Sequence, residues 1–263
     1  MAHCPLDTPD GGKSRNVTVT RIDFDSIYKA RSERYAVVLD DVFTPNECKD
    51  LIAAAEASTT HGWERAMVNI GGGHQKMIED VRNCGRIIWD SPEVVDEVWK
   101  RIEHLPEVQQ IVRLQNVPKI FGLGPQRRGE VWKFTRPNER MRFLKYVGGE
   151  YFRPHCDGTY ETPDRKERSY FTMHLYLNDG GPDSELGGGA TTFHAYNMVG
   201  RIDVVPKAGR VLLFQHRDLL HSGDDVVKGT KYTMRTDLMY TLESSESESR
   251  RKVPTLEDEK PRT

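Results

Sequence analysis

The sequence predicts a mostly β fold, of the barrel or sandwich type, with supporting helices packed outside it. In the second half of the chain, short segments rich in β-branched and aromatic residues follow one another, separated by Gly, Pro and Asp turns. Segments with helical spacing of apolar residues precede them, an order typical of a β core with helical support. The strand-like segments are 170–179, 187–196, 201–206, 209–216 and 231–240.

Length and composition are compatible with one large domain or two small ones. The chain has 263 residues, of which 37% are hydrophobic, so it can bury a sizeable core. Its net charge of -2 gives no general attraction to nucleic acid or to a membrane surface. No apolar run approaches the roughly 18 residues of a membrane span, and residues 1–16 lack the features of a secretory signal. We therefore expect a cytoplasmic or nuclear protein that is not secreted.

Polar stretches at both ends of the chain define the limits of a single expected domain. Residues 1–20 contain few large apolar side chains, and residues 243–263 form a mixed-charge stretch. We expect a flexible N-terminal tail and a disordered C-terminal tail. The domain between them, 21–242, divides into a helical support and lid region at 21–130 and a β core at 131–242.

The first half of the domain contains two signals for the start of a helix. Thr44 and Glu47 form a capping box around Pro45, which stands at the first helical position. Ser91 and Pro92 begin a second segment whose apolar residues recur at helical spacing. Both helices are expected to pack on a sheet through these apolar residues.

Strands are expected at 35–42, 63–70 and 81–89, before the main run of strands. The last two enclose a loop, 71–80, that begins with three consecutive glycines. Long mobile loops in compact domains are often lids over functional sites. The alternative is a solvent-exposed hairpin tip without a role.

Residues 113–145, here called the basic segment, carry nine basic side chains and two acidic ones. A local positive charge of this kind beside an active site can select an acidic substrate. It can equally be a solvated surface, and the sequence does not decide between these interpretations.

The stretch 142–158, RFLKYVGGEYFRPHCDG, predicts two short strands joined by a Gly-Gly turn. The second strand runs into His155 and Asp157, which are separated by one residue. Side chains at i and i+2 of a strand point to the same side, so these two can bind one metal ion together. The pair supplies two of the ligands that a metal site needs.

The later sequence contains both a competitor for this pair and a third ligand. His216 and Asp218 repeat the same spacing, so the motif alone is weak evidence. His221 follows a distant apolar strand and can complete the first pair, whereas it lies in the same loop as the second pair. Two histidines and one carboxylate leave coordination positions open, which favours non-haem Fe(II) over zinc. A noncatalytic module with a structural metal is the alternative.

The last predicted strand, 231–240, alternates polar and apolar side chains. If its polar face points to solvent, it is an ordinary edge strand. If that face points into a barrel, its cations could bind a dicarboxylate through charge-assisted hydrogen bonds. The polar face comprises Lys231, Thr233, Arg235 and Asp237.

A series of motifs in the second half of the chain resembles the 2-oxoglutarate and Fe(II)-dependent dioxygenases, and most closely their prolyl 4-hydroxylase-like branch. The resemblance covers about residues 142–240 and implies a double-stranded β-helix, or jelly roll, for the core at 131–242. It makes 21–242 a single dioxygenase domain. The motifs are, in order, RFLKYVGGEYFRPHCDG, RSYFTMHLYLND, GGGATTFH, PKAGRVLLFQH, LLHSG and GTKYTMRTDLMY.

The same resemblance assigns roles to individual residues. It makes Lys231 the anchor of the 2-oxoglutarate side-chain carboxylate, with Arg235 sharing this task or meeting the substrate. The implied iron ligands are His155, Asp157 and His221. The implied residues that line the co-substrate pocket are Tyr146, Tyr176 and Thr191.

Three residues behind the glycine-rich loop, Arg82, Asn83 and Arg86, are candidates for contacts with the substrate. On one continuous strand, Arg82 and Arg86 would share a face and Asn83 would point the other way. The three candidates therefore cannot all be correct.

The resemblance implies that the enzyme oxidises an unactivated C–H bond with Fe(II), 2-oxoglutarate and O2, and optionally ascorbate, releasing succinate and CO2. Hydroxylation of a prolyl or other side chain of a protein or peptide is the expected outcome, and a small-molecule substrate is the main alternative. A nucleic-acid substrate is disfavoured by the pI near 6.5 and by the lack of an aromatic and basic stripe. No membrane partner is expected, and the sequence leaves the oligomeric state open.

Overall fold

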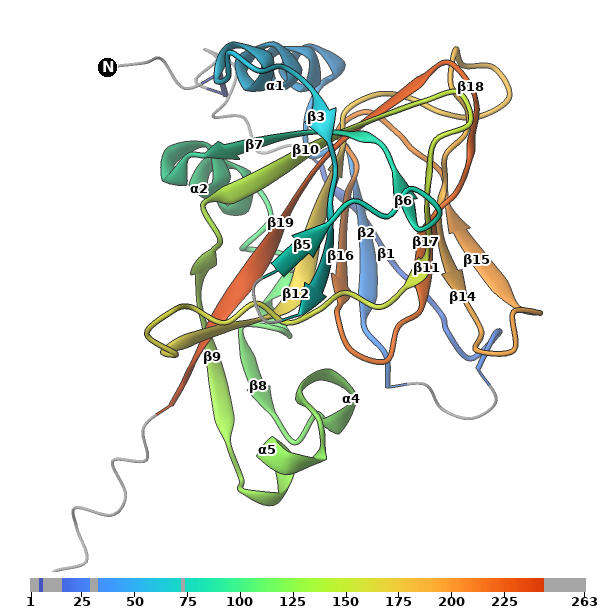
Figure 1. Cartoon of the computed structure of the whole chain (residues 1–263). Helices are drawn as coiled ribbons and strands as arrows, with labels where there is room; N and C mark the ends of the chain where they lie inside the picture. Colours follow the sequence, from blue (N-terminus) through green and yellow to red (C-terminus); the bar gives the residue numbers. More distant parts are fainter. Residues whose placement is uncertain (1–4, 7–15, 29–32, 72–73, 244–263) are drawn as a thin grey trace, which may run out of the picture.

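A computed structural model describes residues 5–6, 16–28, 33–71 and 74–243, and most of its elements are strands. A ten-stranded antiparallel sheet, here called the major sheet, forms one wall (Figure 1). Its order is β1 (Thr18–Arg21), β2 (Ala36–Asp40), β16 (Val211–Gln215), β12 (Glu167–Tyr176), β19 (Thr230–Leu242), β10 (Arg140–Val147), β7 (Gly85–Asp90) and β3 (Glu64–Arg65), with β9 (Val131–Pro137) pairing with β19 and β8 (Arg113–Gln115) pairing with β9.

A five-stranded antiparallel sheet, the minor sheet, lies opposite this wall (Figure 1). Its order is β15 (Arg201–Val204), β14 (Thr191–His194), β17 (His221–Gly223), β11 (Tyr151–His155) and β6 (Arg82–Asn83). Two further pairs are β13 (Gly187–Gly188) with β18 (Val226–Lys228), and β4 (Val68–Gly71) with β5 (His74–Lys76). The two facing sheets confirm the predicted jelly roll with its mostly β content.

The longer helices cover the face of the major sheet that points away from the minor sheet (Figure 1). As predicted, Thr44 caps α1, where its side chain and that of Glu47 form a capping box. Ser91 caps α2 by accepting a hydrogen bond from the backbone N–H of Val94. The helices are α1 (Pro45–Ala57), α2 (Pro92–Lys100), α3 (Pro106–Gln109), α4 (Pro118–Phe121) and α5 (Leu123–Arg127).

Strands β2 and β16 are buried on both faces because they lie between the helices and the minor sheet. On β16, Leu213 packs in the helix-side cluster, whereas Leu212 and Phe214 pack in a second cluster with Phe193 of the minor sheet. Two-sided burial explains why these strands read as continuous apolar runs in the sequence. The core therefore has two layers that share one sheet.

Two sequence predictions need correction at their boundaries. The predicted N-terminal tail is too long, because Thr18–Arg21 pairs with β2 and Val19 packs against the core. The predicted loop 71–80 contains β5, which forms a hairpin with β4. Residues 72–73 and 244–263, which include most of the expected C-terminal tail, lie outside the described part of the chain. Within the described part, no helix is long and apolar enough to cross a membrane.

Candidate metal and co-substrate site

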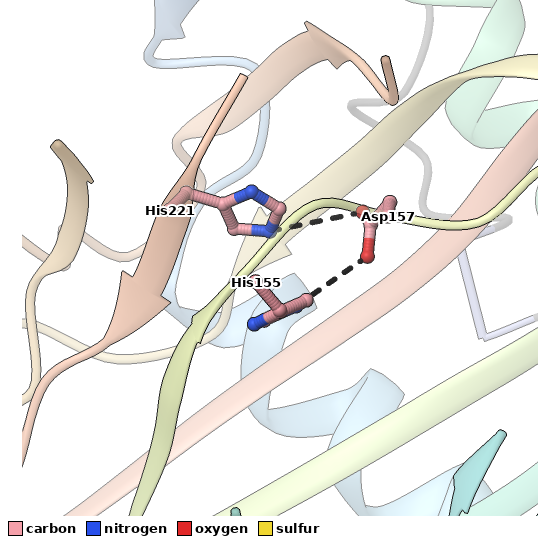
Figure 2. A group of neighbouring side chains, drawn as sticks. All are labelled: His155, Asp157 and His221. Atoms are coloured by element: carbon pink, nitrogen blue, oxygen red, sulfur yellow. Dashed lines mark ion pairs between the residues drawn. The ribbon is translucent and has the colours of Figure 1, made fainter. Parts of the chain in front are cut away.

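The minor sheet brings together His155, from the first motif of the series, and His221, from a much later one. His155 ends β11 and His221 begins β17, and the two residues are direct partners in the antiparallel pair. Asp157 follows β11 by two residues and turns its carboxylate toward both rings (Figure 2). Potential ligand atoms of the three residues all lie within 4.8 Å of one another.

The histidine rings are oriented as metal ligands would be. The Nδ1 atom of His155 lies 2.7 Å from the carbonyl oxygen of Arg153, and that of His221 lies 3.1 Å from the carbonyl oxygen of Leu219. The Nε2 atoms are left facing Asp157, at 3.6 Å and 3.8 Å from its oxygens. The Nε2 atom of His155 is buried without a hydrogen-bond partner. Fixed Nδ1 atoms, and Nε2 atoms that face one carboxylate, fit a divalent metal ion.

The protonation states also fit a metal. Burial raises the pKa of the Asp157 carboxyl, but the nearby Arg235 guanidinium and the two histidines outweigh it and hold this pKa well below its ordinary value. Burial lowers the pKa of His221 to about 3. At neutral pH the site therefore offers a carboxylate and a neutral imidazole, which are the forms that bind metals.

Both oxygens of Asp157 are held by side chains of the major sheet. Arg235 donates to Oδ1 at 2.9 Å, and the Thr172 hydroxyl donates to Oδ2 at 2.6 Å. Arg235 also contacts Asp237 at 3.3 Å, and Arg142 pairs with the other oxygen of Asp237 at 3.2 Å. The alternative role that the sequence allowed for Arg235, as an anchor of the co-substrate, thus competes with two internal ion pairs.

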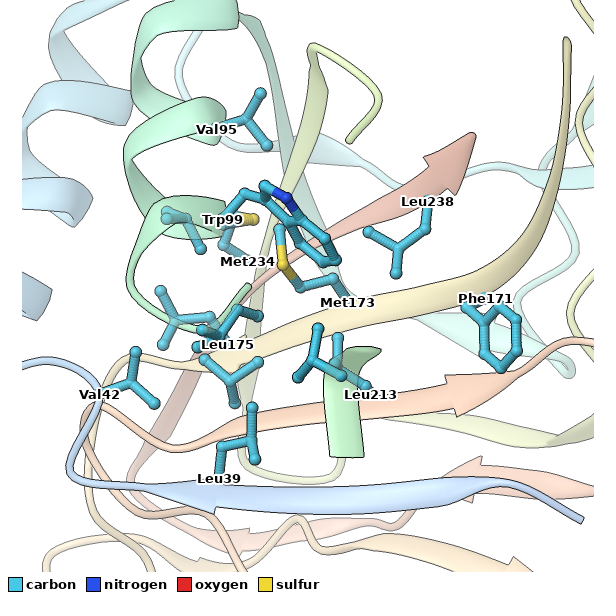
Figure 3. Packing of buried hydrophobic residues seen from close by; sticks show 14 of the residues in the cluster. Leu39, Val42, Val95, Trp99, Phe171, Met173, Leu175, Leu213, Met234 and Leu238 are labelled. Carbon is cyan, nitrogen blue, oxygen red and sulfur yellow. The ribbon is translucent and has the colours of Figure 1, made fainter. Parts of the chain in front are cut away.

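The alternation of β12 and β19 separates this polar site from the core. Met173 and Met234 point toward the helices and pack with Trp99 of α2 (Figure 3). The intervening side chains, such as His174 and Lys231, point to the opposite face and line a cavity between the sheets. The polar face of the last strand is therefore directed inward and is not an exposed edge.

Most of the predicted site residues line the cavity. Lys231 lies directly opposite Tyr146 in the strand register, with its ammonium 5.3 Å from the Tyr146 ring centroid. The ring centroid of Tyr176 lies 5.8 Å from the same ammonium. The Tyr176 hydroxyl donates a hydrogen bond to the Thr191 hydroxyl oxygen at 2.7 Å. The cavity is lined by Arg82, Leu144, Tyr146, Phe152, His155, Thr172, His174, Thr191, Phe214, His221, Ser222, Gly223, Lys231 and Arg235.

Lys231 differs from Arg235 in how its charge is compensated. It is 3% exposed, and among the described residues no carboxylate forms an ion pair with it. Burial lowers the pKa of its ammonium to about 8. A buried ammonium without a counter-ion can bind the carboxylate of a ligand.

The three candidate substrate contacts are separated by a break in the strand. β6 ends at Asn83 and β7 begins at Gly85, so the three side chains do not follow the alternation of one strand. Arg82 lines the cavity, whereas Arg86 donates to Gln75 of β5 at 3.4 Å. Asn83 pairs with Tyr151 at the edge of the minor sheet. Only Arg82 of the three lies among the cavity-lining residues.

Sequence reasoning missed two polar residues of the site, Thr172 and His174. Both lie on the inner face of β12, alternating with Tyr176, and that shared face was the available signal. The Nε2 atom of His174 is buried without a partner. Burial, with the Lys231 and Arg235 cations nearby, holds the pKa of His174 well below its ordinary value. The ring is therefore neutral and has an unused hydrogen-bonding atom.

The competing motif does not form a metal site in the described part of the chain. Asp218 pairs with Arg34 at 3.0 Å and Lys119 at 3.1 Å. His216 is turned toward Asp237, at 3.6 Å. Asp218 therefore belongs to an ion-pair network with Arg34 and Lys119, whereas His216 faces a different carboxylate.

The basic segment is largely neutralised by acidic partners. Arg136 pairs with Glu167 at 2.8 Å, and Arg140 pairs with Asp90 at the same distance. Arg142 pairs with Asp237, as described above. These contacts favour the interpretation of the basic segment as an ion-paired surface.

Comparisons with known proteins agree with this site and fold. Residues 141–236 match the family model of the 2OG-Fe(II) oxygenase superfamily, and this range includes all three potential metal ligands. No curated protein sequence matches the chain.

Solved structures with a similar fold include several prolyl hydroxylases. The viral collagen prolyl hydroxylase of Paramecium Bursaria Chlorella virus-1 is 18% identical with a TM-score of 0.50, over 80% of this chain and 97% of that one. A Pseudomonas putida prolyl-4-hydroxylase is 18% identical with a TM-score of 0.52, over 78% and 93%. A Trichoplax adhaerens prolyl hydroxylase in complex with a hypoxia inducible factor peptide fragment is 15% identical with a TM-score of 0.50, over 77% and 82%. Residues 141–236 are thus identified as a 2-oxoglutarate-dependent dioxygenase domain of the 2OG-Fe(II) oxygenase superfamily, and the chain has the fold of prolyl hydroxylases.

Proposed function

We propose that this dioxygenase hydroxylates an unactivated C–H bond in a prolyl or other side chain of a protein or peptide. In this reaction O2 supplies one oxygen atom to the substrate and one to 2-oxoglutarate, which is converted to succinate and CO2. The observation that carries the proposal is the cluster of His155, Asp157 and His221, whose potential ligand atoms lie within 4.8 Å of one another. Both histidines line a cavity that Lys231 also lines. We assign iron to the first three residues and the distal carboxylate of 2-oxoglutarate to Lys231.

The chain's own residues have defined tasks in this scheme. Bound iron would supply oxygen activation. Arg235 and Thr172 hold the Asp157 carboxylate in one orientation through their hydrogen bonds to its two oxygens. Tyr146 and Thr191 line the part of the cavity next to the Lys231 ammonium. Arg235 is therefore a positioning residue in this proposal, and Lys231 is the co-substrate anchor.

The peptide substrate is supported by the structural relatives. The Trichoplax adhaerens enzyme of similar fold is described in complex with a peptide fragment, and the two others are prolyl hydroxylases. We further propose that the expected domain, 21–242, acts as one catalytic unit once its start is extended to β1 at Thr18, with 131–242 as the jelly-roll core and the preceding residues as support and lid.

The first test uses the visible charge-transfer band that Fe(II) and 2-oxoglutarate give when both bind one site without oxygen. We expect a weak band for the wild-type protein and none for Asp157→Ala, because the substitution removes the carboxylate ligand. Asp218→Ala is the matched control, since it removes the aspartate of the competing motif, and it should retain the band. Absence of the band in the wild-type protein, together with no succinate in any substrate mixture, would contradict the proposed function.

A further inference from the structure

Three cationic side chains line the cavity, and they differ in how their charge is compensated. Arg235 contacts the carboxylates of Asp157 and Asp237. Arg82 and Lys231 are 6% and 3% exposed, and neither forms an ion pair with a described carboxylate. Burying an unpaired cation is costly, so such a group in a cavity indicates an anionic ligand.

Arg82 is held against the wall that carries the metal ligands. Its Nε atom donates to the Cys84 sulfur at 3.4 Å, and its guanidinium carbon lies 4.6 Å from the ring centroid of Phe152. The Phe152 ring in turn stacks on the His155 ring, with 3.6 Å between centroids. The packing thus orients a guanidinium that has one buried terminal nitrogen without a hydrogen-bond partner.

The proposed co-substrate does not compensate this charge. 2-Oxoglutarate has two carboxylates, of which one would bind the metal together with the keto group and the other would pair with Lys231. After both have been assigned, Arg82 is still a buried cation that forms no ion pair with a carboxylate of the described residues. A guanidinium presents its donors in a fork that fits a carboxylate.

We propose that Arg82 binds a carboxylate group of the substrate, so that the enzyme oxidises a carboxylic acid. The acid is either a small molecule or a peptide that presents an acidic side chain or its C-terminal carboxylate near the oxidised carbon. This inference rests on the proposed function, and it narrows the substrate class that the function leaves open.

The test uses the full chain loaded with paramagnetic Mn(II) and 2-oxoglutarate, and it measures the proton relaxation of two probes, acetate and acetamide. The probes have nearly the same shape and differ in charge. We expect acetate to show saturable relaxation enhancement and acetamide to bind at least about tenfold more weakly, because a hydrogen bond between charged groups contributes about 1.5–3 kcal/mol. This comparison needs no variant and is independent of any folding defect.

Two substitutions then locate the acetate site. Arg82→Gln should weaken acetate binding at least about tenfold, while Arg82→Lys should retain part of it. Lys145→Gln is the matched control, since it removes the same charge from a side chain that lies over the rings of Trp63 and Tyr232, outside the cavity lining. It should leave acetate binding unchanged.

Several outcomes would overturn the inference. One is acetamide binding as tightly as acetate, which would indicate recognition of a neutral carbonyl. Another is acetate binding that is equally tight in the wild-type protein and in Arg82→Gln. A third is the absence of acetate binding to the wild-type protein. If Arg82→Gln weakens 2-oxoglutarate binding as much as Lys231→Gln does, Arg82 belongs to the co-substrate site instead. Failure of the proposed function would be seen separately, as the missing Fe(II) and 2-oxoglutarate band in the wild-type protein.

Discussion

The two ends of the cavity differ in how their charges are balanced. At the metal end, Asp157 pairs with Arg235, Arg235 pairs with Asp237, and Asp237 pairs with Arg142, so each charge has a partner within 3.3 Å. At the other end, Lys231 has aromatic rings around its ammonium and no carboxylate partner in the described part of the chain. At the metal end the charges are balanced by ion pairs within the protein, whereas at the other end the Lys231 ammonium has no ion-pair partner among the described residues.

This difference separates two ways of preparing a site. Pairing fixes a side chain before the ligand arrives, which is useful for Asp157 because a metal ligand must be oriented correctly. Leaving a buried cation unpaired reduces the stability of the empty protein, but it preserves the full interaction for an anionic ligand. Substitutions at the two ends should therefore have different effects on stability and on binding.

The largest effect is expected for Arg235→Met, which breaks the paired end. The substitution leaves the buried Asp157 carboxylate without its guanidinium and removes one partner of Asp237. Breaking a buried pair by removing one member typically costs about 3–5 kcal/mol. Urea unfolding of the metal-free protein should show a loss of this size, and Mn(II) should recover part of it by supplying a cation to Asp157.

Arg140→Met is the control for this prediction. Arg140 forms an ion pair with Asp90 at 2.8 Å, but both side chains are about half exposed. An exposed pair contributes at most about 1 kcal/mol. Equal losses for the two variants would show that the paired end has no special role in stability.

The next largest effect is expected for Lys231→Met, at the unpaired end. Replacing a buried, unpaired ammonium by an apolar side chain of similar length should leave the empty protein as stable as the wild type or more stable. Binding of 2-oxoglutarate should weaken by about 30- to 100-fold, because a charged hydrogen bond of roughly 2–3 kcal/mol is lost. Titration of the charge-transfer band measures this affinity. If Arg235→Met weakens 2-oxoglutarate binding and Lys231→Met does not, the assignment of the anchor is wrong.

Local sequence patterns were sufficient for the pair of His155 and Asp157 and for the shared polar face of the last strand, but they left the direction of that face open. The spacing of His155 and Asp157 is a property of one strand, and the alternation of Lys231 and Arg235 is a property of another. The capping box of Thr44 also acts within a few residues, and the helix begins where it predicts. Such features depend on short-range geometry, which the sequence contains directly.

Features that depend on pairing between distant strands could not be predicted. Thr172 and Arg235 meet at Asp157 because β12 and β19 pair in one particular register. A shift of either strand by one residue would turn the side chain of that strand to the helices. The interruption at Cys84, which separates Arg82 from Arg86, arises where the chain passes from the minor to the major sheet. The same limit explains β1, a polar segment that becomes a strand by pairing with β2.

A smaller effect, with a defined pH range, follows from the lowered pKa of Lys231. Its ammonium titrates at about 8 in the folded protein, against an ordinary value of 10.5. Between these two values the unfolded chain binds one more proton than the folded protein, so this group makes the metal-free protein more stable as the pH rises through the range. The free energy of unfolding should rise by on the order of 1.4 kcal/mol per pH unit. The rise should end where the pH passes the pKa of the lysine in the unfolded chain.

Binding of 2-oxoglutarate should change in the opposite direction over the same range. The carboxylate needs the charged ammonium, so its affinity should fall by about tenfold per pH unit above about 8. Urea unfolding of the metal-free protein and titration of Mn(II)-loaded protein with 2-oxoglutarate measure the two trends. Each curve is compared with that of Lys231→Met, which cancels the contributions of other titrating groups and should lack both trends. If stability and affinity changed in the same direction, or if the variant retained the wild-type curves, the pH dependence would come from a group other than Lys231.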